Sequence, residues 1–299
     1  MTMSNKKLIT HDGTFHTDEI FACATLVLIC EKEGAGYEII RTRDEEIIKT
    51  GDYVFDVGGI YDALNNKFDH HQPGGAGSRE NGIEYASFGL VWKKFGIELC
   101  DNQKVADQVD KKLVSPIDAW DNGIDLFESK TDIVPYSINH VFFGMLPTWR
   151  EEDVNKDEVF IKCVELAKNI LSREIIHRNA VVAAEDSVLK IYNETTDKRI
   201  IVLDNNYPFE SNLFKFPEPI FVIYPRKTDH TWGAKAIKAD LKTFKNRKDF
   251  PASWGGLQNE EFQKITGVSD AFFCHHSLYL VAAKSKEGAI KLAQIALES

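Results

Sequence analysis

The sequence predicts an α/β protein with two domains, and three observations support that prediction. The chain has 299 residues, of which 43% are hydrophobic and 27% charged, so it can bury one large core or two ordinary ones. In the first half, short apolar runs alternate with amphipathic helical segments, a pattern typical of a parallel sheet with helices on both faces. Beyond a long helical stretch the pattern changes to paired strands. We therefore expect a parallel-sheet domain over residues 1–150, a helical connector over 151–184 and a smaller α+β domain over 185–299.

The elements of the first domain follow from the spacing of its apolar residues. Strands are expected over residues 7–10, 37–41, 52–57 and 67–69, and helices over 17–32, 85–96 and 102–114. Strands that alternate with helices in this way form right-handed βαβ units. Ligands of such sheets bind beyond the carboxyl ends of the strands. The loops that follow these strands are therefore where a functional site is expected.

The second half begins with a long amphipathic stretch over residues 154–183, which predicts the connecting helix. Residues 187–192 and 199–203 then have strand character and flank the polar segment 193–198, which together predict a β-hairpin. The remaining expected elements are strands over 220–224, 234–237 and 271–274 and a closing helix over 286–297.

Composition argues against several classes of protein. No apolar run reaches the roughly eighteen residues that a membrane helix needs, so no membrane partner is expected. The first residues contain neither an apolar signal core nor an Arg-rich presequence, and the five cysteines form no C-x-x-C pair. We therefore expect reduced thiols and a cytoplasmic location. The net charge of −10 argues against long duplex DNA as a partner, because proteins that bind it normally present a basic face.

Histidines and aspartates gather at the expected ends of secondary-structure elements. Six of the nine histidines occur in three groups: His11 with His16, His70 with His71, and His275 with His276. The first two groups follow expected strands, and Asp56 closes another strand. Asp18 begins the helix after His16, and the segment 118–123 (DAWDNG) adds Asp118 and Asp121 after a helix. These loops can converge above one edge of the sheet.

Mixed imidazole and carboxylate ligands without cysteine suit Mn²⁺ or Mg²⁺, and the imidazoles favour Mn²⁺. Two such ions about 3.5–4 Å apart can bind a phosphate and activate water. Asp56, held at a strand end, is the natural bridge between them. Each residue also has a purely structural explanation. Asp18 could be a helix N-terminal residue favoured by the helix dipole, Asp56 could be a turn residue, and His11 could be a buried core histidine with its hydrogen bonds satisfied. Their combination in order at four element ends favours the metal site.

Six segments of the sequence resemble signature segments of a known family. They are residues 11–19 (HDGTFHTDE), 53–59 (YVFDVGG), 68–72 (FDHHQ), 118–123 (DAWDNG), 250–257 (FPASWGGL) and 271–275 (AFFCH). The chain thus resembles the DHH phosphoesterase superfamily and, more closely, its Myg-type (melanocyte proliferating gene) exonucleases. The resemblance covers nearly the whole chain and implies that the first domain has the DHH-type fold.

The resemblance also implies an activity and its residues. It implies a 3′–5′ exonuclease of RNA, or a hydrolase of short oligonucleotides, that depends on two Mn²⁺ or Mg²⁺ ions. The low basicity of the chain separately favours short single strands or nucleotides as substrates. The metal ligands would be His11, His16, Asp18, Asp56, His70 and either Asp118 or Asp121. His71 would face the phosphate. Superfamily relatives often have a carboxylate near the position of His16, so one metal site is expected to be softer here.

The second domain departs from that family. Its usual Trp-Arg-Gly-Leu segment is Trp254-Gly-Gly-Leu here, without the arginine, and its Gly-rich stretch is replaced by residues 277–283 (SLYLVAA). The remaining groups that could bind an anion are Arg226, Arg247, His275 and His276. For the two arginines a solvated surface role explains the sequence equally well. On a strand, adjacent histidines would point to opposite faces, so at most one of them would line the cleft expected between the domains.

Two alternative functions remain open from the sequence. The altered second domain is compatible with a nucleotide-binding module whose catalysis is reduced. Because metals recognise phosphate and not the base, pyrophosphate or a cyclic dinucleotide could also be the substrate.

Overall fold

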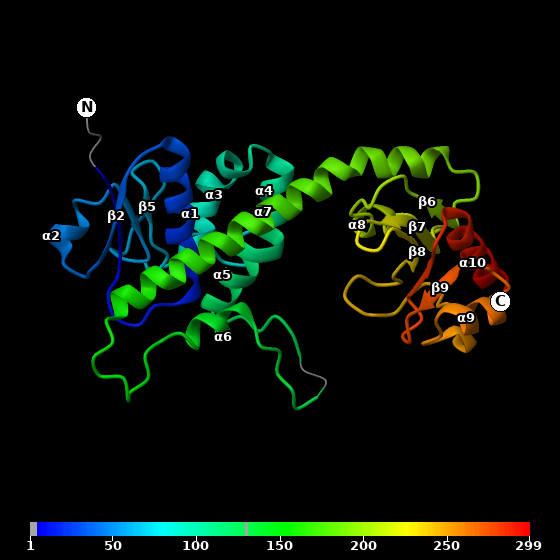
Figure 1. The fold of residues 1–299 in the computed structure, drawn as a ribbon. Helices are drawn as coiled ribbons and strands as arrows, with labels where there is room; N and C mark the ends of the chain where they lie inside the picture. Colours follow the sequence, from blue (N-terminus) through cyan, green and yellow to red (C-terminus); the bar gives the residue numbers. More distant parts are fainter. Residues whose placement is uncertain (1–4, 129–130) are drawn as a thin grey trace. The chain divides into compact units, whose positions relative to one another are not determined.

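A computed structural model describes residues 5–128 and 131–299, which fold as two compact units, Met1–Asn179 and Ala180–Ser299. Figure 1 shows the order of their helices and strands along the chain. Within the described residues the fold is mixed α/β with two five-stranded sheets. This confirms the predicted α/β class. In the described part of the chain, no helix combines the length and the apolar character needed to cross a bilayer.

The first sheet is built mainly from parallel strands, as predicted. Its order is β2 (Tyr37–Arg41), β1 (Lys6–Thr10), β3 (Tyr53–Phe55), β5 (Lys67–Phe68) and β4 (Tyr61–Asp62). The first four strands run parallel, and β4 is antiparallel to β5. The sequence did not predict β4, which has only two residues. The carboxyl ends of β1, β3 and β5 consequently lie side by side at one edge.

One face of this sheet is covered by helices α1 (Thr17–Glu33) and α3 (Ser87–Cys100). The two helices pack against each other through the stacked rings of Phe21 and Phe88, whose centroids are 5.2 Å apart. On the other face, Ile9 and Val54 pack with Ile48 of the short helix α2 (Glu45–Ile48). Alternation of side chains along β1 and β3 therefore supplies both layers of the core.

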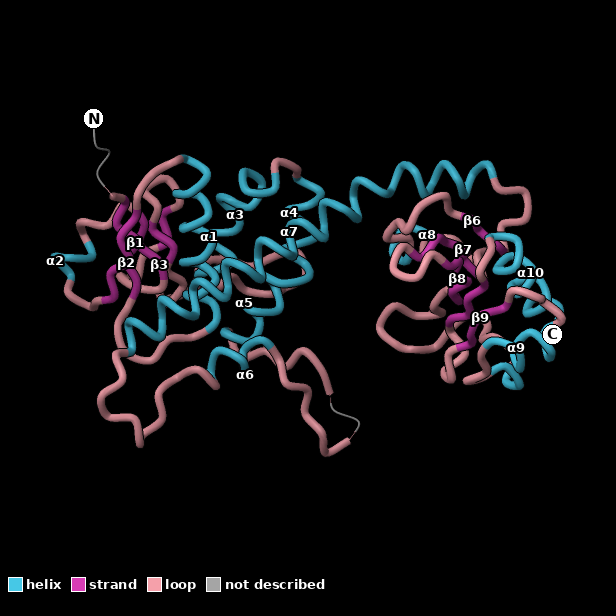
Figure 2. The backbone as a smooth tube through the Cα atoms, in the orientation of Figure 1, coloured by secondary structure: helices cyan, strands magenta, loops and turns pink. Residues whose placement is uncertain are grey.

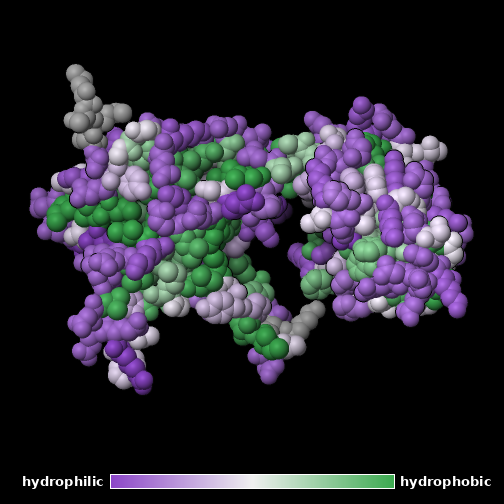
Figure 3. All heavy atoms as spheres, viewed as in Figure 1, coloured by the Kyte–Doolittle hydropathy of each residue, from purple (hydrophilic) through white to green (hydrophobic). Residues whose placement is uncertain are grey.

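After α3, a continuous helical run leads back to the edge of the sheet. It consists of α4 (Gln103–Val109), one π-helical turn (Asp110–Val114) and α5 (Ser115–Asp121). The described residues between α5 and the short helix α6 (Ile138–Phe143) form a loop, and a second loop leads on to helix α7 (Lys156–Glu194) (Figure 2). The first of these loops exposes apolar side chains, visible as green atoms beside the grey residues in Figure 3.

The predicted connecting helix is longer than expected. Helix α7 (Lys156–Glu194) begins in the first unit, where Phe160 packs on Phe15, and ends in the second, where Val188 and Tyr192 are buried. The predicted strand over residues 187–192, and with it the hairpin, is therefore wrong. Val188 and Tyr192 are four residues apart, a spacing that suits one face of a strand as well as one stripe of a helix, and in the structure both lie on the buried stripe of α7.

The second sheet confirms most of the strands predicted for this half. Its order is β6 (Ile200–Val202), β7 (Phe221–Arg226), β8 (Thr231–Ala236), β10 (Leu280–Ala283) and β9 (Ala271–Cys274). Only β6 and β7 pair in parallel. Strand β10 was not predicted. The remaining elements of this unit are α8 (Glu210–Leu213), a 3₁₀ turn (Ala252–Trp254), α9 (Asn259–Thr266) and α10 (Lys286–Glu298).

Candidate metal centre

The site residues of the first unit meet where the parallel strands end. His11 directly follows β1 and Asp56 directly follows β3. His70 is the second residue after β5, with Asp69 between them. Asp18 lies in the first turn of α1, and Asp121 is the last residue of α5. The parallel order of β1, β3 and β5 therefore brings together loops that are distant in the sequence. Asp56 has a left-handed backbone with φ of 53°, which turns the chain sharply at the end of β3.

Asp56 lies at the centre of the cluster, and its two carboxylate oxygens face different histidines. Oδ2 lies 3.2 Å from Nε2 of His11, whereas Oδ1 lies 3.3 Å from Nε2 of His70. Oδ1 also accepts a hydrogen bond of 3.1 Å from the buried hydroxyl of Ser87. One carboxylate that faces two sets of ligands has the arrangement needed to bridge two cations.

The other predicted ligands surround this carboxylate. Asp121 Oδ2 lies 3.3 Å from Nε2 of His70. His16, Asp18 and Asp121 form one group whose potential ligand atoms all lie within 4.8 Å of one another, and Asp56, His70 and His71 form a second. Further groups of this kind join Asp18 to Asp56 and His11 to His16, each with Glu19 as a member. Because the groups share members, they form a single cluster.

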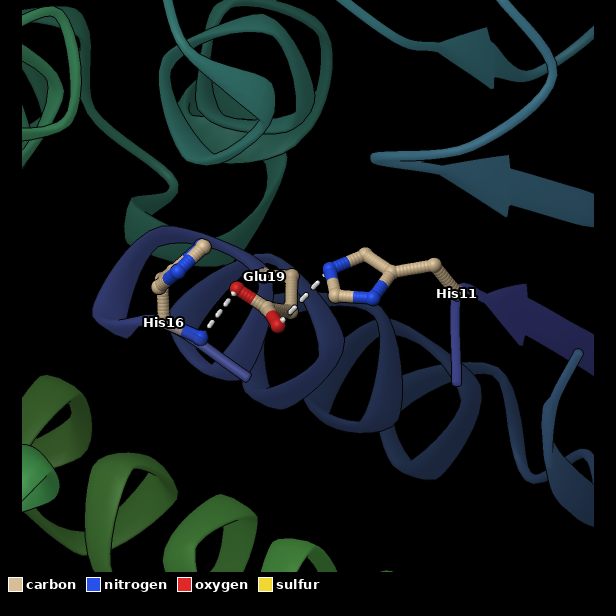
Figure 4. Close-up of side chains that lie close together, drawn as sticks. All are labelled: His11, His16 and Glu19. Carbon is tan, nitrogen blue, oxygen red and sulfur yellow. Dashed lines mark hydrogen bonds and ion pairs between the residues drawn. The ribbon is translucent and has the colours of Figure 1, made fainter. Parts of the chain in front are cut away.

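Glu19 is the member of the cluster that the sequence analysis missed. Its side chain is fully buried, with Oε2 accepting a hydrogen bond of 2.8 Å from the backbone N–H of His16 and Oε1 lying 3.1 Å from Nε2 of His11 (Figure 4). A signal was present in the sequence. An acidic residue three positions after a helix N-cap commonly reaches back to the cap backbone, and here the same carboxylate also contacts an imidazole.

The cluster carries more buried acid than the described residues around it neutralise. Neither carboxylate oxygen of Asp18 receives a hydrogen bond from any described residue, although the side chain is buried. Burial and the nearby carboxylate of Asp56 raise the pKa of Asp18 well above its usual range. A buried carboxylate without a partner is costly unless it is protonated or binds a cation. The donor set therefore fits divalent cations.

The histidines next to these acids are stabilised in their charged form. Burial lowers the pKa of His11, but its interactions with Asp56 and Glu19 outweigh burial and raise the pKa to about 10. For Asp56, burial raises the pKa, and the interactions with His11 and His70 lower it to well below the usual range. Protons thus balance part of the acidic charge in the absence of metal. Bound cations would displace these protons from the imidazoles.

Asp118 lies outside this cluster, so Asp121 is the aspartate that the structure brings to the other ligands. Asp118 Oδ2 pairs with Nη1 of Arg79 at 2.8 Å, and its Oδ1 accepts a hydrogen bond of 3.0 Å from the backbone N–H of Gly89. Position 89 admits this close approach because it has no side chain: a Cβ there would lie 1.8 Å from Asp118 Oδ2. The two aspartates are three residues apart on α5, yet only Asp121 reaches the metal ligands.

His71 differs from the other histidines because most of its side chain, 62%, is exposed. Its Nδ1 lies 2.8 Å from Asp69 Oδ1, and Asp69 in turn accepts a hydrogen bond of 2.6 Å from the backbone N–H of Gly59. His71 faces a cavity of about 660 Å³ that is also lined by Asp56 and Arg43. This is the position expected of a group that meets a substrate. Asp69 and Arg43 were not predicted as site residues.

The two arginines predicted to bind an anion are engaged within the second unit. The Arg247 guanidinium donates hydrogen bonds of 2.9 Å and 3.0 Å to the backbone carbonyls of Pro219 and Phe214. Arg226 pairs with Asp229 at 2.8 Å. The guanidinium of Arg247 thus connects its own loop to the loop between α8 and β7.

The adjacent histidines of the second unit do not lie on a strand. Strand β9 ends at Cys274, and His275 and His276 lie in the turn that follows, with ring centroids 4.3 Å apart. The expectation that they point to opposite faces is therefore wrong, because the turn removes the alternation of a strand. The ring of His275 also lies 4.5 Å from that of Tyr279.

Comparison with known proteins identifies the family of this chain. A family model named MYG1_exonuc, described as "Uncharacterised protein family (UPF0160)", matches residues 7–297. Among relatives, a MYG1 protein of Schizosaccharomyces pombe is 27% identical over 98% of this chain and 97% of its own length. The MYG1 exonuclease of Homo sapiens is 27% identical over 99% of this chain and 86% of its own. The MYG1 exonuclease of Bos taurus has the same identity, over 99% and 85%. The chain therefore belongs to the MYG1 exonuclease family.

Proposed function

We propose that this protein is a divalent-metal-dependent phosphodiester hydrolase, a 3′–5′ exonuclease that acts on RNA or short oligonucleotides. The observation that carries the proposal is the cluster around Asp56, in which carboxylates and imidazoles from strand ends and helix ends that are distant in the sequence face one another. Relatives named exonucleases support a nuclease-like activity. The free, buried cysteines agree with the proposed cytoplasmic location.

The residues that would hold two ions are His11, His16, Asp18, Asp56, His70 and Asp121, with Asp56 between the two. Nitrogen and oxygen donors without sulfur suit Mn²⁺, or Mg²⁺ with less imidazole contact. When bound, such ions neutralise a phosphate and lower the pKa of a water molecule. Glu19 orients His11 through their contact of 3.1 Å, as carboxylates commonly do for metal-binding histidines.

His71 is the residue that we propose to contact the transferring phosphoryl group. Asp69 raises the pKa of His71 through their hydrogen bond, so the imidazole remains charged to higher pH. Because Asp69 occupies Nδ1, the remaining ring nitrogen is available as a donor to a phosphate oxygen. A fixed cationic donor at that place stabilises the charge that develops on phosphate in the transition state.

The charge of the chain limits the substrates that we propose. With a net charge of −10, binding must rest on local contacts and not on a broad basic face. Arg43, whose guanidinium lies 3.4 Å from Asp12, lines the same cavity as His71 and can pair with a phosphate. Such a site suits a short single strand or a nucleotide. We propose that the second domain holds the rest of the substrate, with His275 and His276 as its anion-binding groups.

The test uses a six-nucleotide RNA labelled at its 5′ end, incubated with the full chain and Mn²⁺. We expect a ladder that shortens from the 3′ end, no cleavage in EDTA, and no cleavage by Asp56→Ala or His70→Ala proteins that keep the wild-type circular dichroism. Glu46→Ala, a change at an exposed residue of α2, serves as control. Activity that persists in EDTA would reject the proposal. Tight nucleotide binding without turnover would indicate a nucleotide-binding module instead.

A further inference from the structure

A second cavity, of about 220 Å³, adjoins the candidate metal centre and has a different lining. It shares His16, Asp18 and Asp121 with the cluster of potential ligands. The rest of its wall consists of uncharged residues, namely Thr17, Ile117, Trp120, Asn139 and Phe143. A cavity of this size is smaller than the roughly 300–1,000 Å³ of pockets that hold drug-sized ligands. It therefore suits a single planar ring system next to the metals.

Helical spacing explains how these side chains come to share one wall. On α5, Ile117 and Asp121 are four residues apart, with Trp120 one position before Asp121, so all three lie toward one side of the helix. On α6, Asn139 and Phe143 are also four residues apart and share a face. The cavity thus lies where these two helices meet the start of α1.

The aromatic residues of this wall are open, unlike their neighbours in the core. Phe143 is 48% exposed, whereas the adjacent Phe142 is 1% exposed and packs edge-on against Phe21. Trp120 is 39% exposed. Its indole contacts the ring of His140 at 5.4 Å between centroids, and Nδ1 of His140 accepts a hydrogen bond from the backbone N–H of Ser137. Trp120 is therefore held in place while part of its surface stays accessible.

The same wall contains polar atoms that no described residue satisfies. Asn139 is only 4% exposed, yet its Oδ1 has no hydrogen-bond partner among the described residues. The Oγ1 of Thr17, also buried, lacks a partner among them as well. Buried polar groups without partners are rare in folded proteins and call for an explanation. A ligand with N–H or O–H groups would supply the missing partners.

We propose that this cavity binds the nucleoside next to the bond that is cleaved. Its base lies against Trp120 and Phe143, and Asn139 accepts a hydrogen bond from the nucleoside. Bases stack on exposed aromatic rings regardless of sequence, because every base has a π-face. The shared residues Asp18 and Asp121 place the attached phosphate at the metal centre. This proposal rests on the proposed phosphodiesterase function and adds to it the part of the site that recognises a nucleoside.

The first experiment compares two substrates with the same leaving group. One is uridine 5′-(p-nitrophenyl phosphate) and the other, which has no base or sugar, is methyl p-nitrophenyl phosphate. For Trp120→Ala and Asn139→Leu, we expect the ratio of kcat/KM for the nucleoside substrate to that for the methyl substrate to fall about tenfold, the effect of losing one good contact. Trp149→Ala is the matched control, because Trp149 is 83% exposed and does not line the cavity.

An unchanged ratio in both variants would overturn the proposal. Asn139→Leu also distinguishes a hydrogen bond from Asn139 to the nucleoside from a role of Asn139 in packing alone. If Asn139 only filled space, the leucine would leave the ratio at the wild-type value, since its side chain branches at Cγ as that of asparagine does and leaves no polar atom without a partner. Trp120→Phe keeps an aromatic ring, and we expect it to retain most of the ratio that Trp120→Ala loses.

The second experiment measures binding without catalysis, so that the two proposals can fail separately. Adenosine is titrated into the full chain in EDTA by calorimetry; an uncharged nucleoside is used because Asp18 and Asp121 repel phosphate in the absence of metal. We expect binding by wild-type and Asp56→Ala proteins and at least tenfold weaker binding by Trp120→Ala. No binding to any of them would reject the nucleoside pocket. Binding without hydrolysis of either substrate would reject the phosphodiesterase function alone.

Discussion

The carboxylate of Asp69 holds His71 from one side: Oδ1 lies 2.8 Å from Nδ1 of His71, while Oδ2 accepts a hydrogen bond from the backbone of Gly59. The imidazole is consequently fixed in orientation and its pKa is raised, chiefly by this hydrogen bond. Residues 69–71 (DHH) thus have three roles in the proposed site, of which the third, contact with the phosphate, belongs to His71. The first of these residues positions the third, and the second contacts Asp56 and Asp121.

Asp69→Asn should weaken catalysis and move its pH dependence. Removal of the negative charge lowers the pKa of His71, and the charged imidazole is the form proposed to contact phosphate. In the wild type we expect kcat/KM to decline as pH rises through the pKa of His71, because the imidazole loses its charge. In the variant this decline should begin at lower pH. We expect kcat/KM to fall about 10–100-fold, the usual cost of losing such a supporting carboxylate. A pH profile of kcat/KM with the wild-type shape would contradict this role.

Glu19→Gln should weaken Mn²⁺ binding more than it weakens the fold. Glu19 contacts both His11 and the backbone at His16, so its carboxylate orients ligands and adds negative charge beside the ions. A loss of about 10–100-fold in metal affinity is expected, measured by calorimetry. Glu46→Gln, which changes an exposed carboxylate paired with Lys49, is the control. Equal affinity in the two variants would mean that Glu19 acts only as a helix cap.

Binding of Mn²⁺ should release protons, and its affinity should rise with pH. In the metal-free site the pKa of His11 is raised to about 10, so the imidazole is protonated at neutral pH and must lose its proton to bind a cation. Each proton released adds a slope of about one to the logarithm of the association constant against pH below that pKa. Calorimetry in buffers of different ionisation enthalpy counts the protons. An affinity independent of pH between about 6 and 9 would contradict a direct role for His11.

Arg79→Met should destabilise the protein strongly, because it leaves a buried charge without its partner. Arg79 pairs with the fully buried Asp118, whose pKa burial raises to about 7 even with the arginine present. The same guanidinium also pairs at 2.8 Å with Asp110, whose side chain is 30% exposed. Loss of one partner of a buried ion pair costs about 3–5 kcal/mol. With the arginine present Asp118 becomes neutral as pH falls through about 7, so the loss should be fully developed only above that pH and should shrink below it. Urea unfolding at several pH values measures it.

The matched control for that variant is Arg199→Met, because Arg199 pairs with Asp197 on the surface. Both side chains of this pair are more than half exposed. Such pairs contribute about 0–1 kcal/mol. The double variant Arg79→Met/Asp118→Leu should recover much of the lost stability, since no buried charge remains. If Arg79→Met were no more destabilising than the control, the pair would have no structural role.

Local sequence patterns were sufficient to predict the elements whose structure is decided by neighbouring residues in the sequence. The alternation of strands and helices predicted that β1, β3 and β5 run parallel, although not their order in the sheet, and strand ends marked His11, Asp56 and His70 as neighbours. Residues 187–192 show the limit of such patterns. Val188 and Tyr192 fit a strand or a helix equally, and burial in the core of the second unit decides for the helix.

The amino-acid sequence by itself determined the α/β class, the family and most of the groups that can hold a metal, because periodicity and motif spacing are properties of the chain. Only the tertiary structure decided that Asp121 and not Asp118 reaches the cluster, and that Glu19 belongs to it. The physical reason is that charge pairing acts through space. Arg79 comes from a loop far from α5 in the sequence and pairs with Asp118, and no local pattern contains that contact.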